Sequence, residues 1–243
     1  GGSGIGNYDG TISTLTNSGT IRSQSSNAIY NNTGAEITTL NNAVGGVIGS
    51  TWSDGIFNAG LIGAVSNSGD IHGTTGISNG GTIGAGTTAT TYTGTIGTLT
   101  NSGTIRGTRS SGNVAGINNA INSSIGTLNN SGTISSDIAA IVNTGTITTI
   151  NNSSSGTLDG AVGIVNIGTI TTLTNDGRIS ASGTPPVMFS AGIFNGGLIT
   201  TLTNNQSGVI SDGQVGIANL MGGSITTLIN KGIVRGSDIG IYN

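Results

Sequence analysis

The sequence predicts an all-β protein, a right-handed parallel β-helix of about nine to ten coils. Two observations predict this fold. First, a short pattern recurs twice in each of many consecutive repeats: an apolar residue, then Asn two positions later, Gly two positions after that, and a closing apolar residue. Second, the opening and closing apolar residues are usually six or eight positions apart, which is an even number. Internal repetition of this kind is typical of solenoids, in which each repeat forms one coil.

The stretch GIVNIGTITTLTNDGRI, residues 163–179, contains both halves of one repeat. In the first half Ile164 precedes Asn166, and in the second half Leu173 precedes Asn175. The asparagines of the first half are Asn7, Asn31, Asn58, Asn79, Asn119, Asn143, Asn166, Asn195, Asn219 and Asn243. The asparagines of the second half are Asn17, Asn42, Asn67, Asn101, Asn130, Asn152, Asn175, Asn204 and Asn230.

The even spacing indicates strands, because side chains on a strand alternate between two faces and only an even step returns to the same face. The step from the first half to the second is odd, as in the three positions from Ile147 to Ile150. Both residues can face inward only if the chain turns between them, so we expect a corner at Thr148 and Thr149. Each strand should pair in parallel with its copy one coil later, about 4.8 Å away, with right-handed connections.

The two asparagine columns are expected to point inward at corners and to stack. A buried side-chain amide needs hydrogen-bond partners, and the amide of the next coil supplies one. Glycine suits the tight turns beside them, because it adopts positive φ without a steric penalty.

Composition bounds the function. The 243 residues include 46 Gly, only 6% charged residues and no Cys, and the net charge is −3. Such a chain lacks the basic face that nucleic acid requires, and no apolar run is long enough for a membrane-spanning helix. We expect one β-helix domain over residues 1–243, as a fragment of a longer surface protein. We expect no cofactor.

Repeats such as GIVNIGTITTLTNDGRI and GTIGTLTNSGTIRG resemble the passenger regions of bacterial autotransporter adhesins. The resemblance covers essentially the whole chain. It implies a secreted right-handed β-helix that reaches the bacterial cell surface through the outer membrane. The implied function is adhesion without catalysis, with partners that are other copies on neighbouring cells, host or environmental surface molecules, or glycans.

Chemistry-bearing residues do not form a repeated column. His72 is the only histidine, and the pattern places it on an outer, solvated slot after the closing Ile71. A glycan-cleaving enzyme needs two carboxyl groups that converge on the substrate. A glycan-cleaving or glycan-binding β-helix is therefore one alternative function, and Asp137 and Asp159 are its best pair of acids. However, no position of the repeat carries an acid in successive coils. We expect neither a catalytic nor a metal site.

Threonine columns support a second alternative, an ice-binding solenoid. The second residue of the expected corner is threonine in every coil except at Ala64. The companion position is mixed, because Gly63, Gly97 and Gly126 interrupt it. Threonine also suits exposed strand positions for purely structural reasons.

The residue between the first Ile and Asn should point outward, and it is apolar or aromatic in several coils. Exposed apolar columns often mark contact surfaces, although nearby loops could also fold over this one. Loops on a rigid scaffold often carry binding residues, and one such loop is an insertion between Ile83 and Ile96. The candidate contact residues, from the column and the loops, are Tyr30, Trp52, Phe57, Tyr92, Val142, Val165, Met188, Phe189 and Phe194.

Overall fold

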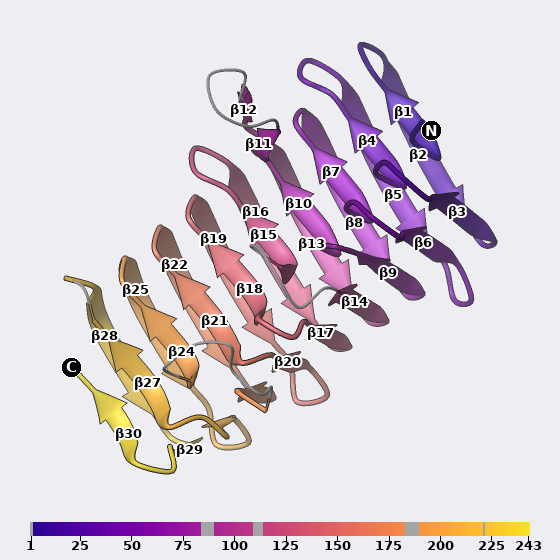
Figure 1. The fold of residues 1–243 in the computed structure, drawn as a ribbon. Coiled ribbons are helices and arrows are strands. Elements are labelled where there is room, and N and C mark those ends of the chain that lie inside the picture. Colours follow the sequence, from indigo (N-terminus) through magenta and orange to yellow (C-terminus); the bar gives the residue numbers. More distant parts are fainter. Residues whose placement is uncertain (1, 84–89, 109–113, 183–189, 221) are drawn as a thin grey trace.

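The computed structural model describes residues 2–83, 90–108, 114–182, 190–220 and 222–243. In these residues the chain forms a parallel β-solenoid of about nine turns and no helix. Each coil contributes one strand to each of three sheets, and Figure 1 shows the coils stacked from the N-terminal to the C-terminal end. The predicted fold class is confirmed, and the right-handed sense of winding stays a prediction.

Chain order within each coil runs from the first sheet to the third. The first sheet consists of β1 (Ile5–Asn7), β4 (Ile29–Asn31), β7 (Ile56–Asn58), β10 (Ile77–Asn79), β15 (Ala115–Asn119), β18 (Ala139–Asn143), β21 (Val162–Asn166), β24 (Ala191–Asn195), β27 (Val215–Asn219) and β30 (Ile239–Tyr242). The second sheet consists of β2 (Thr11–Asn17), β5 (Glu36–Asn42), β8 (Leu61–Asn67), β13 (Thr95–Asn101), β16 (Ser124–Asn130), β19 (Thr146–Asn152), β22 (Thr169–Asn175), β25 (Leu198–Asn204) and β28 (Ser224–Asn230). The third sheet consists of β3 (Thr20–Ser23), β6 (Val47–Ser50), β9 (Asp70–Gly73), β14 (Thr104–Gly107), β17 (Thr133–Ser135), β20 (Thr157–Asp159), β23 (Arg178–Ser180), β26 (Val209–Ser211) and β29 (Ile233–Val234).

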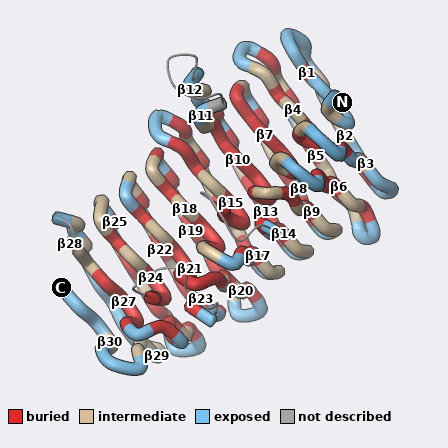
Figure 2. The backbone as a smooth tube through the Cα atoms, in the orientation of Figure 1, coloured by how far each residue is buried: buried red, intermediate tan, exposed pale blue. Residues whose placement is uncertain are grey.

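The core is a narrow column of isoleucine and leucine between the three sheets. Ile147, Ile150 and Leu158, one coil's contribution from the second and third sheets, are all fully buried. Register is strict, since Ile147 pairs with Ile170 and Ile150 with Leu173 in the next coil. Figure 2 shows buried residues recurring at matching positions from coil to coil. Each coil therefore covers the apolar side chains of the coil before it.

The expected corner at the threonine pair is a bend within one strand. Strand β19 runs without a break through Thr148 and Thr149, although Ile147 and Ile150 both point inward. The parallel pairing skips Thr148 and resumes at Thr149. The chain can therefore reverse its side-chain alternation at one unpaired position and keep the rest of the ladder. The prediction of a turn was right, but the turn lies within one continuous strand.

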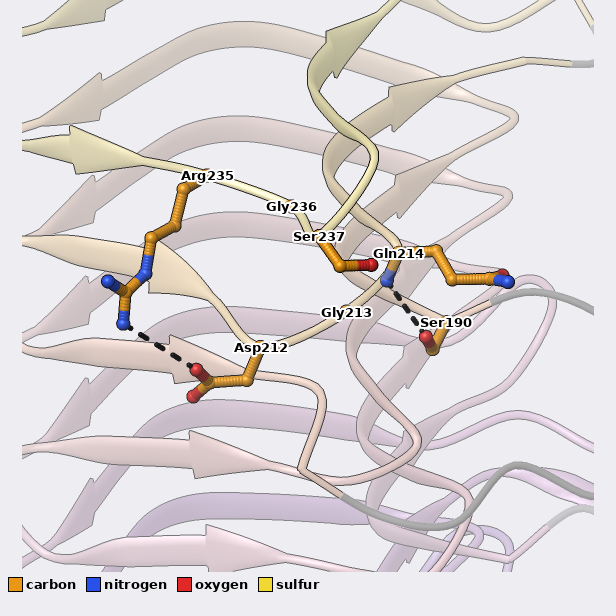
Figure 3. Close-up of a pocket in the computed structure, with 7 residues that line it drawn as sticks. All are labelled: Ser190, Asp212, Gly213, Gln214, Arg235, Gly236 and Ser237. Atoms are coloured by element: carbon orange, nitrogen blue, oxygen red, sulfur yellow. Dashed lines mark hydrogen bonds and ion pairs between the residues drawn. The ribbon is translucent and has the colours of Figure 1, made fainter.

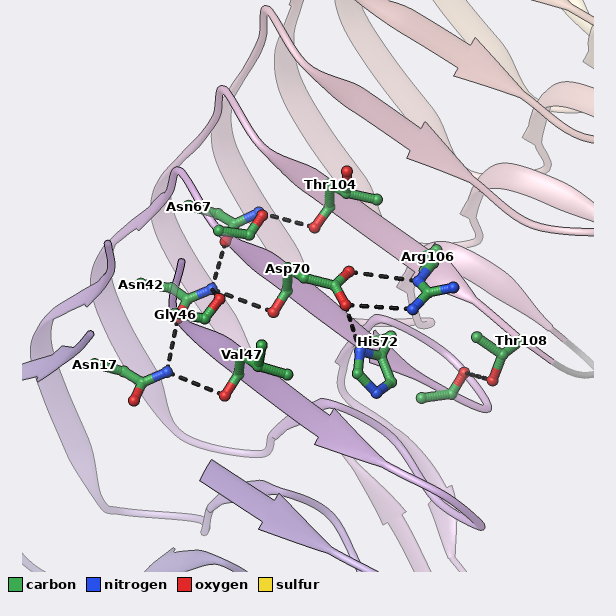
Figure 4. A network of polar contacts seen from close by, with 12 residues as sticks. Asn17, Asn42, Gly46, Val47, Asn67, Asp70, His72, Thr104, Arg106 and Thr108 are labelled. Carbon is green, nitrogen blue, oxygen red and sulfur yellow. Dashed lines mark hydrogen bonds and ion pairs between the residues drawn. The ribbon is translucent and has the colours of Figure 1, made fainter. Parts of the chain in front are cut away.

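Two ladders of asparagine side chains run along the core, as predicted. In every coil the Nδ2 atom donates to the Oδ1 atom of the matching asparagine in the next coil, at 2.6–3.0 Å. Figure 4 shows the ladder through Asn17, Asn42 and Asn67. The second Nδ2 proton faces backbone carbonyls, such as Thr169 O for Asn143 at 3.0 Å. This contact fixes the amide orientation, because a flipped amide would place two acceptors together.

The Gly-Ile or Ala-Ile dipeptide that opens each repeat follows from the narrow core. At this point the first sheet comes close to the third, and only a small side chain fits. A Cβ atom on Gly116 would lie 2.6 Å from Cγ2 of Ile134. Ala140 occupies the same slot in the next coil and is fully buried. The small residue is therefore a packing requirement.

The long insertion lies between Gly80 and Gly94, and not after Ile83 as the pattern predicted. Gly81–Ile83 forms β11, which pairs in antiparallel fashion with β12 (Thr90–Tyr92). Ile96 takes the buried core position and pairs with Ile62 and Ile125. Both Gly-Thr-Ile copies satisfy the sequence pattern. The second copy lies three positions before Leu99, so it alone completes the seven-residue strand β13.

Candidate functional site

A row of aromatic rings lies on the outer face of the first sheet, where the sequence predicted a contact column. Tyr30 and Phe57 pair in register, with stacked rings and centroids 5.7 Å apart. Tyr8 extends the row at one end at 5.7 Å, and Tyr92 closes the other end edge-on at 5.9 Å from Phe57. Tyr8 was missed because it follows Asn7 and so falls outside the repeated column.

The hairpin covers part of this row. Tyr92 is on β12, and Phe57 beneath it is only 4% exposed. Burial also raises the pKa of the Tyr30 hydroxyl, with smaller contributions from Tyr92 and Tyr8. Tyr8 is 60% exposed. The interpretation that loops cover the column therefore holds for Phe57. Tyr8, which joins the row from outside the column, is open to solvent.

The apolar members of the column lie further along the same face. Val142 pairs with Val165, and Val165 pairs with Phe194, so the three stand in register on successive coils. All three are half-buried. Phe194 packs against a small apolar cluster that includes Val215 and Leu220. The candidates Met188 and Phe189 lie outside the described residues.

Trp52 is the most prominent exposed candidate. It follows β6 in the turn that leads to the first sheet, and it is 63% exposed. An exposed Trp is costly to leave in water, and Trp is among the residues that most often anchor protein contacts.

Charged side chains gather on the third sheet. His72 Nδ1 lies 2.8 Å from Asp70 Oδ2, and Arg106 of the next coil lies 3.3 Å from the same oxygen (Figure 4). The His72 side chain is only 16% exposed, because its ring lies over Gly49 of the preceding coil. His72 does lie on an outer slot, but its ring is more covered than the prediction of a solvated histidine implied, because a glycine in the preceding coil leaves room for it.

The two candidate acids of the enzymatic alternative meet at one pocket. Asp137 and Asp159 both line a cavity of about 460 Å³ beside the third sheet. Asp159 accepts hydrogen bonds at both carboxylate oxygens, from the hydroxyls of Ser180 and Ser182, each at 2.5 Å. The two serine hydroxyls therefore hold the Asp159 carboxyl group in a fixed orientation at the cavity, and each of its oxygens keeps a further lone pair.

A second cavity, of about 400 Å³, lies at the same edge of the solenoid nearer the C-terminal end (Figure 3). Asp212 lies between two arginines here, with Arg235 at 3.9 Å and Arg178 closer. The backbone N–H of Gln214 donates to Ser190 Oγ at 3.0 Å. The ionic groups in this cavity are thus paired with one another.

Asp54 is an acid whose pKa departs strongly from its ordinary value. Burial raises the pKa of its carboxyl to about 6, although hydrogen bonds from the Ser78 hydroxyl and the Thr75 N–H oppose the shift. In the unfolded chain this group titrates near pH 4. The neutral form is therefore favoured in the folded state. The associated stability is fully present below about pH 4 and is lost as the pH rises through about 6.

We expect Asp54→Asn to remove this pH dependence. The free energy of unfolding of the wild type should fall, relative to the variant, by about 2 kcal/mol between about pH 4 and about pH 7.5. Urea denaturation of both proteins at the two pH values measures the difference. Asp9→Asn, at an exposed carboxyl, should follow the wild type. If Asp54→Asn kept the pH dependence of the wild type, the assignment to Asp54 would be contradicted.

Within the described ranges, no group of three or more His, Cys, Asp or Glu side chains could hold a metal ion. The same part of the chain contains no helix long and apolar enough to cross a bilayer. The three stacked parallel sheets place the protein in the class of parallel β-solenoids. No protein-family model, curated protein or solved structure matches this chain.

Proposed function

We propose that the chain is the adhesive part of a β-helical surface protein, similar to the passenger of an autotransporter adhesin, and that it acts without catalysis. The proposed location is the outside of the bacterial cell, after export through the outer membrane. The proposed partners are other copies on neighbouring cells and molecules of host or environmental surfaces, including glycans. The repeats quoted above support the family, and the solenoid agrees with it.

One observation carries the proposal: in the first sheet the inward residues repeat from coil to coil, whereas the outward residues vary. The inward positions of the first sheet pair Ile with Ile and Asn with Asn through successive coils. The outward position between them is, in coil order, Tyr30, Phe57, Ser78, Asn118, Val142, Val165, Phe194 and Ala218. A constant interior makes a scaffold. The outward side chains that are half-buried, such as Tyr30, Asn118 and Val142, are available for recognition.

The geometry suits adhesion through many weak contacts. The sheets run the length of a stacked rod, so contacts on successive coils are held at fixed spacing. When one contact forms, the next one forms at high effective concentration. Trp52 and Tyr8 supply exposed aromatic anchors on different edges of the first coils.

We expect Trp52→Ser to weaken adhesion and to leave the fold intact. The chain is displayed on beads or on non-adherent cells, and clumping and surface attachment are measured. Trp52 is largely exposed, so its replacement removes an anchor without opening the core. Val44→Ser is the matched control, because Val44 is 83% exposed at a turn between the second and third sheets. It should retain wild-type adhesion.

Excision of residues 81–93 is the second test. A Cβ atom on Gly80 would lie 3.2 Å from the Gly94 nitrogen, so these residues can be joined directly. The junction reads Ile-Ser-Asn-Gly-Gly-Thr-Ile, which restores the regular repeat. Phe57→Ser accompanies the excision, to avoid exposing the ring. We expect reduced adhesion and unchanged circular dichroism. Folded wild type that neither clumps nor attaches to any surface would contradict the proposal.

A further inference from the structure

The outer face of the second sheet differs from the other two sheets in its chemistry. Each of its nine strands presents four outward positions, and all nine strands lie within the described residues. Glu36 is the only charged residue among these positions, and none of them is aromatic. The charges concentrate on the third sheet and the turns, and the aromatic rings lie on the first sheet and its loops. The second sheet therefore presents a nearly neutral surface of hydroxyl, methyl and amide groups, with Leu61, Leu198 and Ile229 as its larger apolar side chains.

Threonine dominates this surface in the last four strands, β19, β22, β25 and β28. There the companion column, which is interrupted by glycine in earlier coils, is also threonine. The threonines are Thr146, Thr148 and Thr149 on β19; Thr169, Thr171, Thr172 and Thr174 on β22; Thr200, Thr201 and Thr203 on β25; and Thr226 and Thr227 on β28. The register is strict, with Thr149, Thr172, Thr201 and Thr227 paired in sequence.

These hydroxyl groups have no protein partner among the described residues. Elsewhere, surface hydroxyls bond to the backbone of the neighbouring coil: Ser153 Oγ donates to Asn130 O, and Ser155 Oγ donates to Ser131 O. No such bond involves the threonines of these four strands, whose side chains are exposed or half-buried. Their hydrogen-bonding capacity is therefore directed at whatever lies against the face.

Backbone hydrogen bonds fix the spacing of this array. Neighbouring coils are about 4.8 Å apart, and alternate residues on one side of the bend, such as Thr146 and Thr148, are about 6.6 Å apart. Hydroxyl and methyl groups at fixed points on a lattice order adjacent water at low entropic cost, because the protein groups are already immobile. Charged groups would disrupt such order, and within these four strands none is present.

We propose that the threonine face of β19, β22, β25 and β28 binds ice. The partner must be neutral, periodic and hydrogen-bonding, and must need no aromatic platform. A crystalline glycan shares the first three properties, but glycan-binding faces use aromatic rings for stacking on sugars, and this face has none. Ordered water needs only hydroxyl and methyl groups in register. The inference rests on the second sheet alone and is independent of the adhesive role proposed above.

The test is thermal hysteresis and ice-affinity partitioning of the purified chain. Thr172→Lys combined with Thr201→Lys places two bulky cations at the centre of the face. Thr104→Lys combined with Thr133→Lys is the matched control, because these residues are also outward neighbours on adjacent coils but belong to the third sheet. Circular dichroism checks that both variants keep the β-solenoid.

We expect the wild type and the control to show thermal hysteresis and to partition into ice, and the Thr172/Thr201 variant to lose both properties. Absence of ice binding in the folded wild type would overturn the proposal. Equal activity in the two variants would also overturn it. A pull-down with crystalline cellulose or chitin completes the experiment. Retention that depends on Thr172 and Thr201, without thermal hysteresis, would assign the face to a glycan instead.

Discussion

Replacing Asn143 by aspartate is expected to lower the free energy of unfolding by about 4 kcal/mol. Asn143 is fully buried and sits in the middle of its ladder. Its Oδ1 accepts from Asn119, and its Nδ2 donates to Asn166 Oδ1, each at 2.8 Å. Aspartate keeps the first bond but turns a second oxygen toward Asn166 Oδ1 and Thr169 O. The substitution therefore buries a charge against acceptors.

Urea denaturation at neutral pH measures this loss, and Asn151→Asp is its control. Asn151 lies on the outer face of the second sheet, where its exposed amide donates to Asn129 Oδ1. Its replacement should change the stability little. When the carboxyl introduced by Asn143→Asp is protonated, it regains a donor, so the cost should shrink in acid. An equal effect of the two substitutions would show that the ladder contributes no more than a surface amide.

Replacing Gly163 by valine is expected to lower the free energy of unfolding by about 3 kcal/mol. A Cβ atom at this position would lie 2.6 Å from both Cγ2 of Ile179 and the carbonyl oxygen of Gly192. At this point the first sheet lies close to Ile179 of the third sheet, and the backbone of the next coil lies beside Gly163. Valine adds two methyl groups that have no space.

Thermal and urea denaturation compare Gly163→Val with Gly163→Ala and Gly19→Val. Ala140 already occupies the matching slot one coil earlier, so the slot accepts a Cβ atom once its neighbours shift, and alanine should cost less than valine. Gly19 has no heavy atom within 4 Å of an added Cβ, so valine should cost little there. If Gly163→Val were as stable as Gly163→Ala, the packing explanation of the Gly-Ile dipeptide would be wrong.

Most of the scaffold could be predicted because the repeat carries two constraints: the spacing of its apolar residues and the recurrence of its asparagines. The even spacing between the opening and closing apolar residues was enough to indicate strands and to separate inward from outward residues. The asparagine ladders followed from the need of a buried amide for partners, and Asn31 and Asn42 lie where this predicts. The bend at the threonine pair was predicted only in part, because an odd spacing shows that the chain turns but not whether pairing continues through the turn.

The insertion shows where sequence reasoning failed. Ile83 and Ile96 follow identical Gly-Thr dipeptides, so local pattern gives each an equal claim to the core. The choice is made by pairing on both sides, where Ile96 lies between Ile62 and Ile125. These pairings join residues that are far apart in the chain, so the local sequence pattern does not contain them.

The candidate surface was predicted in position but not in exposure. The column between Ile and Asn does run along the first sheet, as its parity requires. Whether a ring in it is open depends on the insertions, and Phe57 is covered by Tyr92 from thirty-five positions further along the chain. Tyr8 joins the row from outside the column. It lies in a turn, where the alternation of side chains along a strand does not apply, so the sequence pattern could not place it. The distribution of charge, which separates the second sheet from the third, is visible only after strands are assigned to sheets.

Side-chain amide hydrogen exchange, followed by nuclear magnetic resonance, tests the stacked-coil account most directly. If the asparagine columns form buried ladders, the Nδ2 protons of Asn119, Asn143 and Asn166 should exchange far more slowly than those of Asn151, whose amide lies on the outer face. Exchange of the ladder amides at the same rate as Asn151 would mean that water reaches them, and would contradict the in-register interior on which every outward surface described above is built.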